Sequence, residues 1–361
     1  MTTPAADSLL AALDRLTDPR DPRGVRHPFP GLLAVTFLGL LCRHGDFASI
    51  ARWAKHHWPA LRPALGFTRT DTPHATTLSP AAARFSVAQF RAALTDWLTR
   101  AVADEPWAAA VDGKTSKQAL DTAGDPIHVL NVFAHTIKVC LADWPVGDGK
   151  HTEPDVLKAH LDELFRAWPS LQVLTGDALF CQRPLARAIV AAGRDYLLAV
   201  KDNQPDLHEA IRTAFAAAAP AGAAATAGYA RSALNFPGLR VVLRVDCETR
   251  PPAGPATVET RYFASSLDPS RITPGQLLAL VRGHWQVENC LHFEKDRWWD
   301  EDRHVCRRPG LAQRFTTLLS AAVTILRTIH PGEPDEPLKA QADALNWDIA
   351  RAINLFTGHL L

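Results

Sequence analysis

The stretch AAAVDGKT at residues 108–115 combines a short apolar run with an abrupt polar ending. An apolar run of this length, bounded by turn-forming residues, predicts a buried β-strand from Ala108 to Val111. The stretch LQVLTGD at residues 171–177 has the same pattern. Each predicted strand therefore ends close to an aspartate, which is Asp112 in the first and Asp177 in the second.

The segments around these two strands predict an α/β fold. Further strands are expected at 129–134, 139–144 and 196–200, and helices at 154–168 and 184–192. The order β-β-β-α-β-α-β predicts a mixed five-stranded sheet with helices. Strands at 239–245 and 258–264 predict a β-rich insertion at about 205–270, in which the Ala-rich run 212–230 forms a surface helix or a loop. Helices at 276–293 and 313–329 follow.

The two ends of the chain read as helical. Residues 1–103 predict an all-α N-terminal domain with helices at 32–42, 47–58 and 87–102. The segment 104–330 forms the α/β domain, and 331–361 a C-terminal tail with a short helix near 342–356. Residues 1–100 hold 12 Lys and Arg against 7 Asp and Glu. This excess favours an anionic partner, although an ordinary solvated surface fits the same charges.

Composition argues against several classes of protein. The six cysteines include no CxxC pair, which argues against a zinc finger, and free thiols suit a reducing cytosol. The longest apolar run, Phe29 to Cys42, is shorter than the roughly 20 residues of a membrane-spanning helix. The sequence therefore predicts a cytoplasmic protein with no membrane partner.

Asp112 and Asp177 stand where α/β proteins place their active sites, at the carboxyl ends of neighbouring parallel strands. Two carboxylates at such an edge repel each other unless a cation neutralises them. Mg²⁺ prefers hard oxygen ligands of this kind. The alternative interpretation of each residue is an aspartate that only starts a turn.

Glu288 is a third candidate. On a regular helix it shares one face with His284, His292 and Lys295. The alternative interpretation of this face is a solvated polar stripe.

Taken together, the motifs resemble a known family. They are DGKT at 112–115, GDALFCQ at 176–182, YLLAVKDNQ at 196–204 and HWQVENCLH at 284–292. This set is similar to the DDE insertion-sequence transposases of the ISAs-one, or H-repeat-associated, family. The segment 18–28 resembles the N-terminal domain associated with that family. The resemblance covers roughly residues 15 to 330.

The resemblance implies an RNase H-like enzyme that cleaves DNA and transfers strands. Asp112, Asp177 and Glu288 match the catalytic, metal-binding triad, which implies two Mg²⁺ ions, with Mn²⁺ as a substitute. The implied partners are the terminal inverted repeats of the transposon and target DNA, bound by a homodimer at the nucleoid.

Several basic residues are candidates for DNA contacts. The resemblance implies a phosphate contact for Lys295, for which a solvated lysine is the alternative. His284 stands where the wider group has arginine, and Arg282 is a substitute for it. Lys114 contacts phosphate or forms a salt bridge. The N-terminal candidates are Arg20, Arg23, Arg26, Arg52 and Lys55. The pair Trp298 and Trp299 stacks on a base or packs in the core.

Three other functions remain open on the sequence. The first is a catalytically inactive or domesticated transposase that only binds DNA, and the second is a nuclease without strand transfer. The third is a zinc protein that uses His284, His292, His304 and either Cys290 or Cys306.

Overall fold

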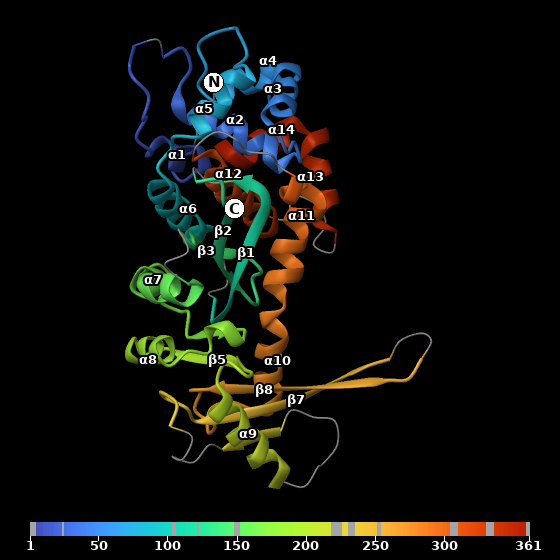
Figure 1. Cartoon of the computed structure of the whole chain (residues 1–361). Helices are drawn as coiled ribbons and strands as arrows, with labels where there is room; N and C mark the ends of the chain where they lie inside the picture. The colour runs from blue at the N-terminus through green and yellow to red at the C-terminus, as the bar shows by residue number, and fades with distance from the viewer. Residues whose placement is uncertain are drawn as a thin grey trace.

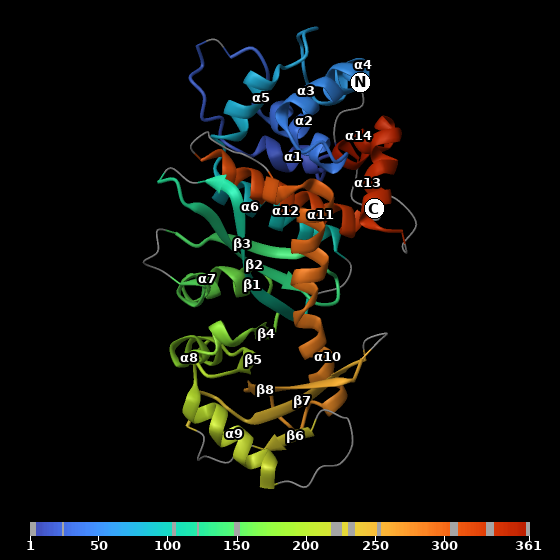
Figure 2. The same ribbon diagram turned by 45° about the vertical axis from the view of Figure 1, so that its right-hand side comes forward.

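The computed structural model describes ten stretches of the chain: residues 5–23, 25–102, 106–120, 123–147, 152–217, 226–229, 235–250, 254–303, 310–329 and 336–358. The fold is a mixed α/β arrangement, as predicted. Figures 1 and 2 show an elongated molecule with a helical part at one end, the sheet in the middle and a long β-hairpin at the other end.

Six helices form the described N-terminal part: α1 (Leu9–Asp14), α2 (Phe29–Leu41), α3 (Phe47–His56), α4 (Trp58–Ala64), α5 (Ala75–Ala82) and α6 (Val87–Ala101). Helix α2 lies at their centre, because it is apolar on every side and only Pro30 escapes full burial along it. It packs against α1, α3 and α5. The helices predicted at 32–42, 47–58 and 87–102 correspond to α2, α3 and α6.

The described strands form one sheet in the order β3-β2-β1-β4-β5-β8-β7-β6. They are β1 (Ala108–Leu120), β2 (Pro126–Ala134), β3 (Cys140–Pro145), β4 (Val173–Gly176), β5 (Asp195–Val200), β6 (Thr226–Tyr229), β7 (Val241–Thr249) and β8 (Thr257–Ser265). Strands β1, β4 and β5 are parallel, whereas the other neighbours pair antiparallel.

The prediction of five strands was wrong in one respect, because the insertion does not form a sheet of its own. Strand β8 pairs with β5 from Leu197 to Val200, and β7 and β6 continue outward from it. An unpaired edge at β5 would leave backbone N–H and C=O groups without partners, and β8 supplies them. The Ala-rich run 212–230 contributes residues to the end of helix α9 (Pro205–Ala217) and to strand β6. The rest of the run lies outside the described residues.

Strand β1 is longer than predicted. It does not end at Asp112 but continues to Leu120, because β2 pairs with it antiparallel over this whole length. The parallel pairing with β4 stops at Val111. Asp112 is therefore the first residue past the parallel ladder, where side chains are free to face an open edge of the sheet.

Helices cover both faces of the central strands. Helices α7 (Glu153–Ala167) and α8 (Arg183–Ala191) pack on one side (Figure 1). Helices α10 (Pro274–His284), α11 (Phe293–Trp299) and α12 (Leu311–Ile329) lie on the other. Because successive side chains of a strand point to opposite faces, β1 has side chains facing each of the two helical layers.

The C-terminal segment forms two helices where one was predicted, α13 (Leu338–Trp347) and α14 (Ile349–Thr357). Helix α14 returns to pack on α1, α2 and α4, and the backbone N–H of Ala5 bonds to the carbonyl of Thr357 at 3.0 Å. The two ends of the chain therefore share one core. The predicted boundaries near 103 and 330 fall outside the described residues, and they stay predictions. None of the described helices combines the length and apolar character needed to cross a bilayer.

Candidate active site

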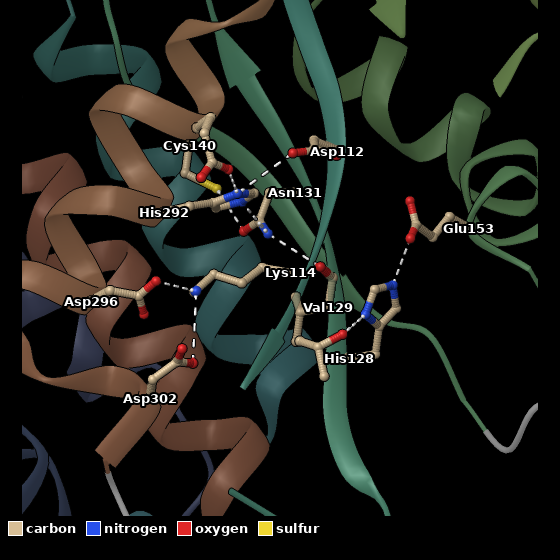
Figure 3. Close-up of polar contacts among 12 residues, drawn as sticks. Asp112, Lys114, His128, Val129, Asn131, Cys140, Glu153, His292, Asp296 and Asp302 are labelled. Carbon is tan, nitrogen blue, oxygen red and sulfur yellow. Dashed lines mark hydrogen bonds and ion pairs between the residues drawn. The ribbon is translucent and has the colours of Figure 1, made fainter. Parts of the chain in front are cut away.

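Asp112 lies at the centre of a group of carboxylates. Its side chain is 29% exposed, and Oδ2 lies 3.5 Å from Nδ1 of His292 (Figure 3). The pKa of Asp112 is raised to about 7, first by burial and then by the negative charges of Glu153, Asp177 and Glu288. The structure therefore brings the three carboxylates predicted from the sequence into one electrostatic neighbourhood.

Asp177 directly follows β4, as predicted, and its side chain is exposed. Its Oδ1 accepts a hydrogen bond of 2.8 Å from the backbone N–H of Leu179. This bond caps the short 3₁₀ turn η1 (Ala178–Phe180) and holds one carboxylate oxygen in place. The other oxygen, Oδ2, makes no hydrogen bond within the described part of the chain.

Glu288 stands in an irregular stretch of helix. The predicted helix 276–293 is present, but α10 and α11 are joined through a π-helical turn, Glu288–His292 (η3). A π turn holds an extra residue, which rotates the side chains that follow it around the helix axis. The predicted single stripe is therefore wrong: Glu288 has a 61% exposed side chain, whereas Lys295 is fully buried.

His292 contacts two of the three carboxylates. It is buried, and its Nδ1 lies 3.1 Å from Oε2 of Glu288 and 3.5 Å from Oδ2 of Asp112. Its Nε2 lies 3.4 Å from Nδ2 of Asn131, a donor. These partners assign a neutral ring with the proton on Nδ1, donated toward Glu288. Burial lowers the pKa of His292, which keeps the ring neutral.

Sequence reasoning placed His292 on one helix face with Glu288 and considered it as a zinc ligand, but it did not predict the contact with Asp112. Its spacing of four residues from Glu288 was the signal that pointed to it. His284, the other proposed zinc ligand of this helix, instead lies 3.2 Å from Oγ1 of Thr175 through its Nδ1. His304 and Cys306 lie outside the described residues.

The donor set fits a divalent cation. One ligand atom each from Asp112, Glu288 and His292 lies within 4.8 Å of the others. Carboxylate oxygens are ligands of Mg²⁺ and Mn²⁺, and Asp112 and Glu288 supply them, whereas the proton on Nδ1 of His292 makes this imidazole a donor to Glu288 and not a ligand. Burial, followed by the neighbouring negative charges, raises the pKa of Asp112, and a bound cation would offset those charges.

A fourth carboxylate, from Glu153 at the start of α7, was missed by sequence reasoning. After burial, its charge is the largest cause of the raised pKa of Asp112. Oε1 of Glu153 lies 2.7 Å from Nε2 of His128, and Nδ1 of His128 lies 2.7 Å from Oγ1 of Thr115 (Figure 3). The carboxylate packs directly against Gly113, where a β-carbon would collide with it. A side chain at position 113 would therefore displace the Glu153 carboxylate from this position.

Lys114 is held by acidic side chains. Its Nζ lies 2.7 Å from Oδ2 of Asp296 and 3.9 Å from Oδ1 of Asp302, and the side chain is largely buried. Of the two predicted roles, the salt bridge is the one observed. The phosphate contact stays a prediction, for a charge that Asp296 and Asp302 compensate in this structure.

Lys295 is likewise not at the surface. Its Nζ lies 2.9 Å from Oε1 of Glu301 and 3.3 Å from Oγ of Ser320, with 0% of the side chain exposed. The alternative of a solvated lysine is wrong, and the phosphate contact stays a prediction that would require Lys295 to leave this ion pair. Lys295 lies in the core, where a buried charge that left its partner would cost several kcal/mol, roughly 3–5.

His284 also points inward, toward Thr175 and the charge of Asp177, and its DNA contact stays a prediction. Arg282 remains exposed on α10. Trp299 is buried and donates from Nε1 to the carbonyl of Leu40 at 2.7 Å, which confirms the core interpretation for this residue. Trp298 is half-buried beside the cations of Arg43, Arg297 and Lys339.

The N-terminal candidates lie far from these carboxylates along the fold. Arg20, Arg23 and Arg26 belong to the segment before α2, at the helical end of the molecule (Figure 2). Arg52 and Lys55 are exposed on α3. The structure therefore separates the predicted DNA-binding residues into two groups, one beside the carboxylates and one on the helical part.

Residues 130–325 match the protein family described as "Transposase DDE domain". The chain belongs to the DDE transposase family. Residues 10–98 match a second family, described as "DDE_Tnp_1-associated". These matches confirm the predicted family, and the protein is a transposase, a DNA-cleaving enzyme. The DDE match begins after Asp112, so it contains only Asp177 and Glu288 of the predicted triad.

Curated relatives agree with this family. The transposase is 24% identical over 348 residues to "Putative protein YbfL" of Escherichia coli (strain K12), covering 88% of this chain and 90% of the relative. The "H repeat-associated putative transposase YhhI" of the same organism shows the same identity and coverage.

Among solved structures, the fold resembles that of a piggyBac transposase in a synaptic complex with hairpin DNA. The TM-score is 0.50 at 11% sequence identity, over 97% of this chain and 78% of the other. This likeness concerns the fold. DDE transposases generally use a divalent metal ion, with which the acidic and histidine group of this transposase agrees.

Proposed function

We propose that Asp112, Asp177 and Glu288 are the catalytic residues of this transposase and that strands β1–β5 with their helices form an RNase H-like core. The observation that carries the proposal is the convergence on Asp112. Glu288 belongs to the same close group of ligand atoms, and the charge of Asp177 acts on the same carboxylate. These residues come from a strand, a strand end and a helix that only the fold brings together.

Two divalent ions, Mg²⁺ with Mn²⁺ as a substitute, would be held by the three carboxylates and would supply charge stabilisation for phosphoryl transfer. Within the chain, Asp112 presents its carboxylate at the open edge of the sheet. The N–H of Leu179 fixes Asp177, and His292 orients Glu288 by donating from Nδ1. Such hydrogen bonds orient the catalytic carboxylates before the substrate binds, and this preorganisation accounts for much of an enzyme's rate enhancement.

The substrate of this reaction is DNA at the terminal inverted repeats of an insertion sequence, and then target DNA. Cleavage at the ends and strand transfer use the same carboxylates in succession. Because two ends must be joined together, we infer a homodimer on DNA, acting in the cytoplasm at the nucleoid. Arg282 is the exposed basic residue closest in sequence to Glu288 and is proposed to contact a DNA phosphate, as are Arg20, Arg23 and Arg26 on the helical part.

The proposal is tested by cleavage of labelled DNA that carries the inverted repeats flanking the gene, with Mg²⁺ or Mn²⁺. The wild type is compared with Asp177→Asn. Asp206→Asn serves as the matched control, since Asp206 is an exposed aspartate in the first turn of α9. We expect metal-dependent cutting at the ends by the wild type and the control, and a loss of at least about a hundredfold in Asp177→Asn.

Each other outcome would change a different part of the proposal. Cutting that survives in Asp177→Asn would remove this aspartate from the triad. A folded wild type that binds the ends without cutting them would favour an inactive, domesticated transposase. Cutting without joined products would favour a nuclease that lacks strand transfer.

A further inference from the structure

A group of polar side chains joins helix α10 to the centre of the sheet. The hydroxyl of Thr175, in β4, lies 3.0 Å from Nε2 of His135 and 3.2 Å from Nδ1 of His284. Thr175 and His135 are buried. His135 directly follows β2, whereas His284 is the last residue of α10. Together these three residues form a polar connection between β4 and α10, the Thr175 joint.

The protonation of the two histidines is compatible with this joint. Burial is the main cause that lowers the pKa of His135, to about 4, and it also lowers the pKa of His284. A neutral imidazole has one nitrogen that donates and one that accepts, and a hydroxyl carries a single proton. The hydroxyl of Thr175 can therefore donate to one ring and accept from the other, so that both contacts are hydrogen bonds.

Helix α10 comes close to His135 because residue 283 is a glycine. Gly283 is buried, and a β-carbon at this position would collide with the ring of His135, including Cγ. Cγ is the ring atom bonded to the β-carbon of His135, so it cannot move unless the whole side chain does. A side chain at position 283 would therefore push α10 away from the sheet or separate His135 from Thr175.

The joint lies a short way along the chain from two of the proposed metal ligands. Thr175 is two residues before Asp177, and two residues of strand span about 7 Å. His284 is four residues before Glu288, and four residues of helix rise about 6 Å. Little chain is left between the joint and either carboxylate to absorb a shift. A movement of α10 along β4 would therefore change the separation of the two carboxylates.

Apolar side chains of α10 also pack on the sheet. Leu277, Leu280 and Val281 are buried on this helix, which packs against β1 and β4 (Figure 2). Apolar packing is non-directional, whereas a hydrogen bond weakens steeply when its angle or length changes. The Thr175 joint therefore supplies a directional contact that fixes the position of α10 on β4.

We propose that the Thr175 joint positions Glu288 relative to Asp177 and thereby sets the affinity of the site for its divalent cation. Its members are positioning residues, which act through the strand and the helix that carry the two carboxylates. The inference rests on the proposed function, because it takes both carboxylates as metal ligands. It goes beyond that function by giving a role to residues that hold no metal.

The test measures metal binding without DNA, so that a changed DNA contact cannot affect the result. Calorimetric titration with Mn²⁺ gives the dissociation constant, and urea unfolding in EDTA shows whether each variant folds. Thr175→Val keeps the shape of the side chain and removes the hydroxyl, whereas Thr175→Ser keeps the hydroxyl. Thr36→Val is the matched control, since Thr36 is a buried threonine of α2 whose Oγ1 donates to the carbonyl of Leu32 at 2.9 Å.

We expect Thr175→Val to bind Mn²⁺ about 10–100-fold more weakly than the wild type, because the loss of outer partners of metal ligands acts on this scale. Thr175→Ser should restore most of the affinity, and Thr36→Val should keep all of it. In cleavage assays, the Mg²⁺ concentration for half-maximal activity should rise in Thr175→Val more than the rate at saturating Mg²⁺ falls. A purely structural role would lower the stability in EDTA and leave the Mn²⁺ affinity of the folded protein unchanged. That result would overturn the proposal.

His284→Phe tests the joint from the helix, and it replaces Thr175→Val if that variant does not fold. The side chain of His284 is half-buried, and phenylalanine fills a similar space without a ring nitrogen. We expect the same loss of Mn²⁺ affinity, and an unchanged affinity would contradict the proposal.

Asp177→Asn separates failure of the joint from failure of the proposed function. If Asp177→Asn binds Mn²⁺ as tightly as the wild type, Asp177 is not a metal ligand and the proposed function fails. If it loses Mn²⁺ while Thr175→Val and His284→Phe retain the wild-type affinity, only the joint is contradicted.

Discussion

Nδ1 of His292 lies 3.5 Å from Oδ2 of Asp112, although the two residues come from a π-helical turn and from the first strand of the sheet. The same nitrogen lies 3.1 Å from Oε2 of Glu288. One buried imidazole thus contacts two proposed catalytic carboxylates. A contact between its Nε2 and Nδ2 of Asn131 fixes its orientation.

Replacing this imidazole should impair catalysis while leaving the fold intact. We expect His292→Gln to lower the cleavage rate by about 10–100-fold and to raise the Mg²⁺ concentration for half-maximal activity, because outer partners of metal ligands act on this scale. Cleavage rates across a Mg²⁺ titration measure both effects. His56→Gln, on the exposed face of α3, is the control. Equal metal dependence in the variant and the wild type would count against a role at the site.

The raised pKa of Asp112 predicts a pH dependence of stability in the metal-free protein. Its pKa is about 7 in the folded chain, against about 3.9 in an unfolded one. Between these values the folded state holds a proton that the unfolded state has released. The free energy of unfolding contributed by Asp112 is therefore greatest below about pH 4 and falls as the pH rises through about 7.

Urea unfolding in EDTA at about pH 5 and about pH 8 measures this dependence. We expect Asp112→Asn to show a smaller loss of stability between the two values than the wild type does. Added Mg²⁺ should stabilise the wild type more at the higher pH, and the variant less. A variant with the same loss as the wild type would show that other groups cause it.

The buried ion pair of Lys295 and Glu301 leads to a prediction about the stability of the protein, not about DNA binding. We expect Lys295→Met to lower the free energy of unfolding by about 3–5 kcal/mol, because Glu301 is left charged and buried. Lys295→Met/Glu301→Leu should recover most of this loss. Chemical denaturation measures both variants. If the double variant were stable but showed a reduced salt slope for DNA binding, Lys295 would have to contact phosphate after all.

The close approach of the Glu153 carboxylate to Gly113 leads to a prediction about stability. A β-carbon at Gly113 would displace the Glu153 carboxylate, the far end of a flexible side chain, so Gly113→Ala should destabilise the protein by about 1 kcal/mol, through the lost contact with His128. Gly113→Ala/Glu153→Ala should be closer to the wild type than the sum of the two single changes. A double-mutant cycle of unfolding free energies measures this coupling. Additive effects would mean that the two residues do not meet.

Much of this transposase could be predicted from the sequence because the signals involved are local. Apolar runs and helical periodicity predicted the strands β2–β5, β7 and β8 and helices α7, α8 and α12, and turn residues marked where Asp177 follows β4. The family was inferred from a resemblance, which short motifs around Asp112, Asp177 and Glu288 carry. Each of these features depends on residues close together in the chain.

The tertiary structure decided what depends on partners far away. Strand β1 passes beyond Asp112 because β2 hydrogen-bonds to it, and the sheet grows past β5 because β8 completes its edge. The packing of α11 against η4 (Glu301–Arg303) and α12 places Lys295 in the core beside Glu301, and the same fold sets His292 against Asp112. Hydrogen bonds between distant strands and the rotation of a helix about its axis are fixed only when the whole chain packs, and they are what assembled the site.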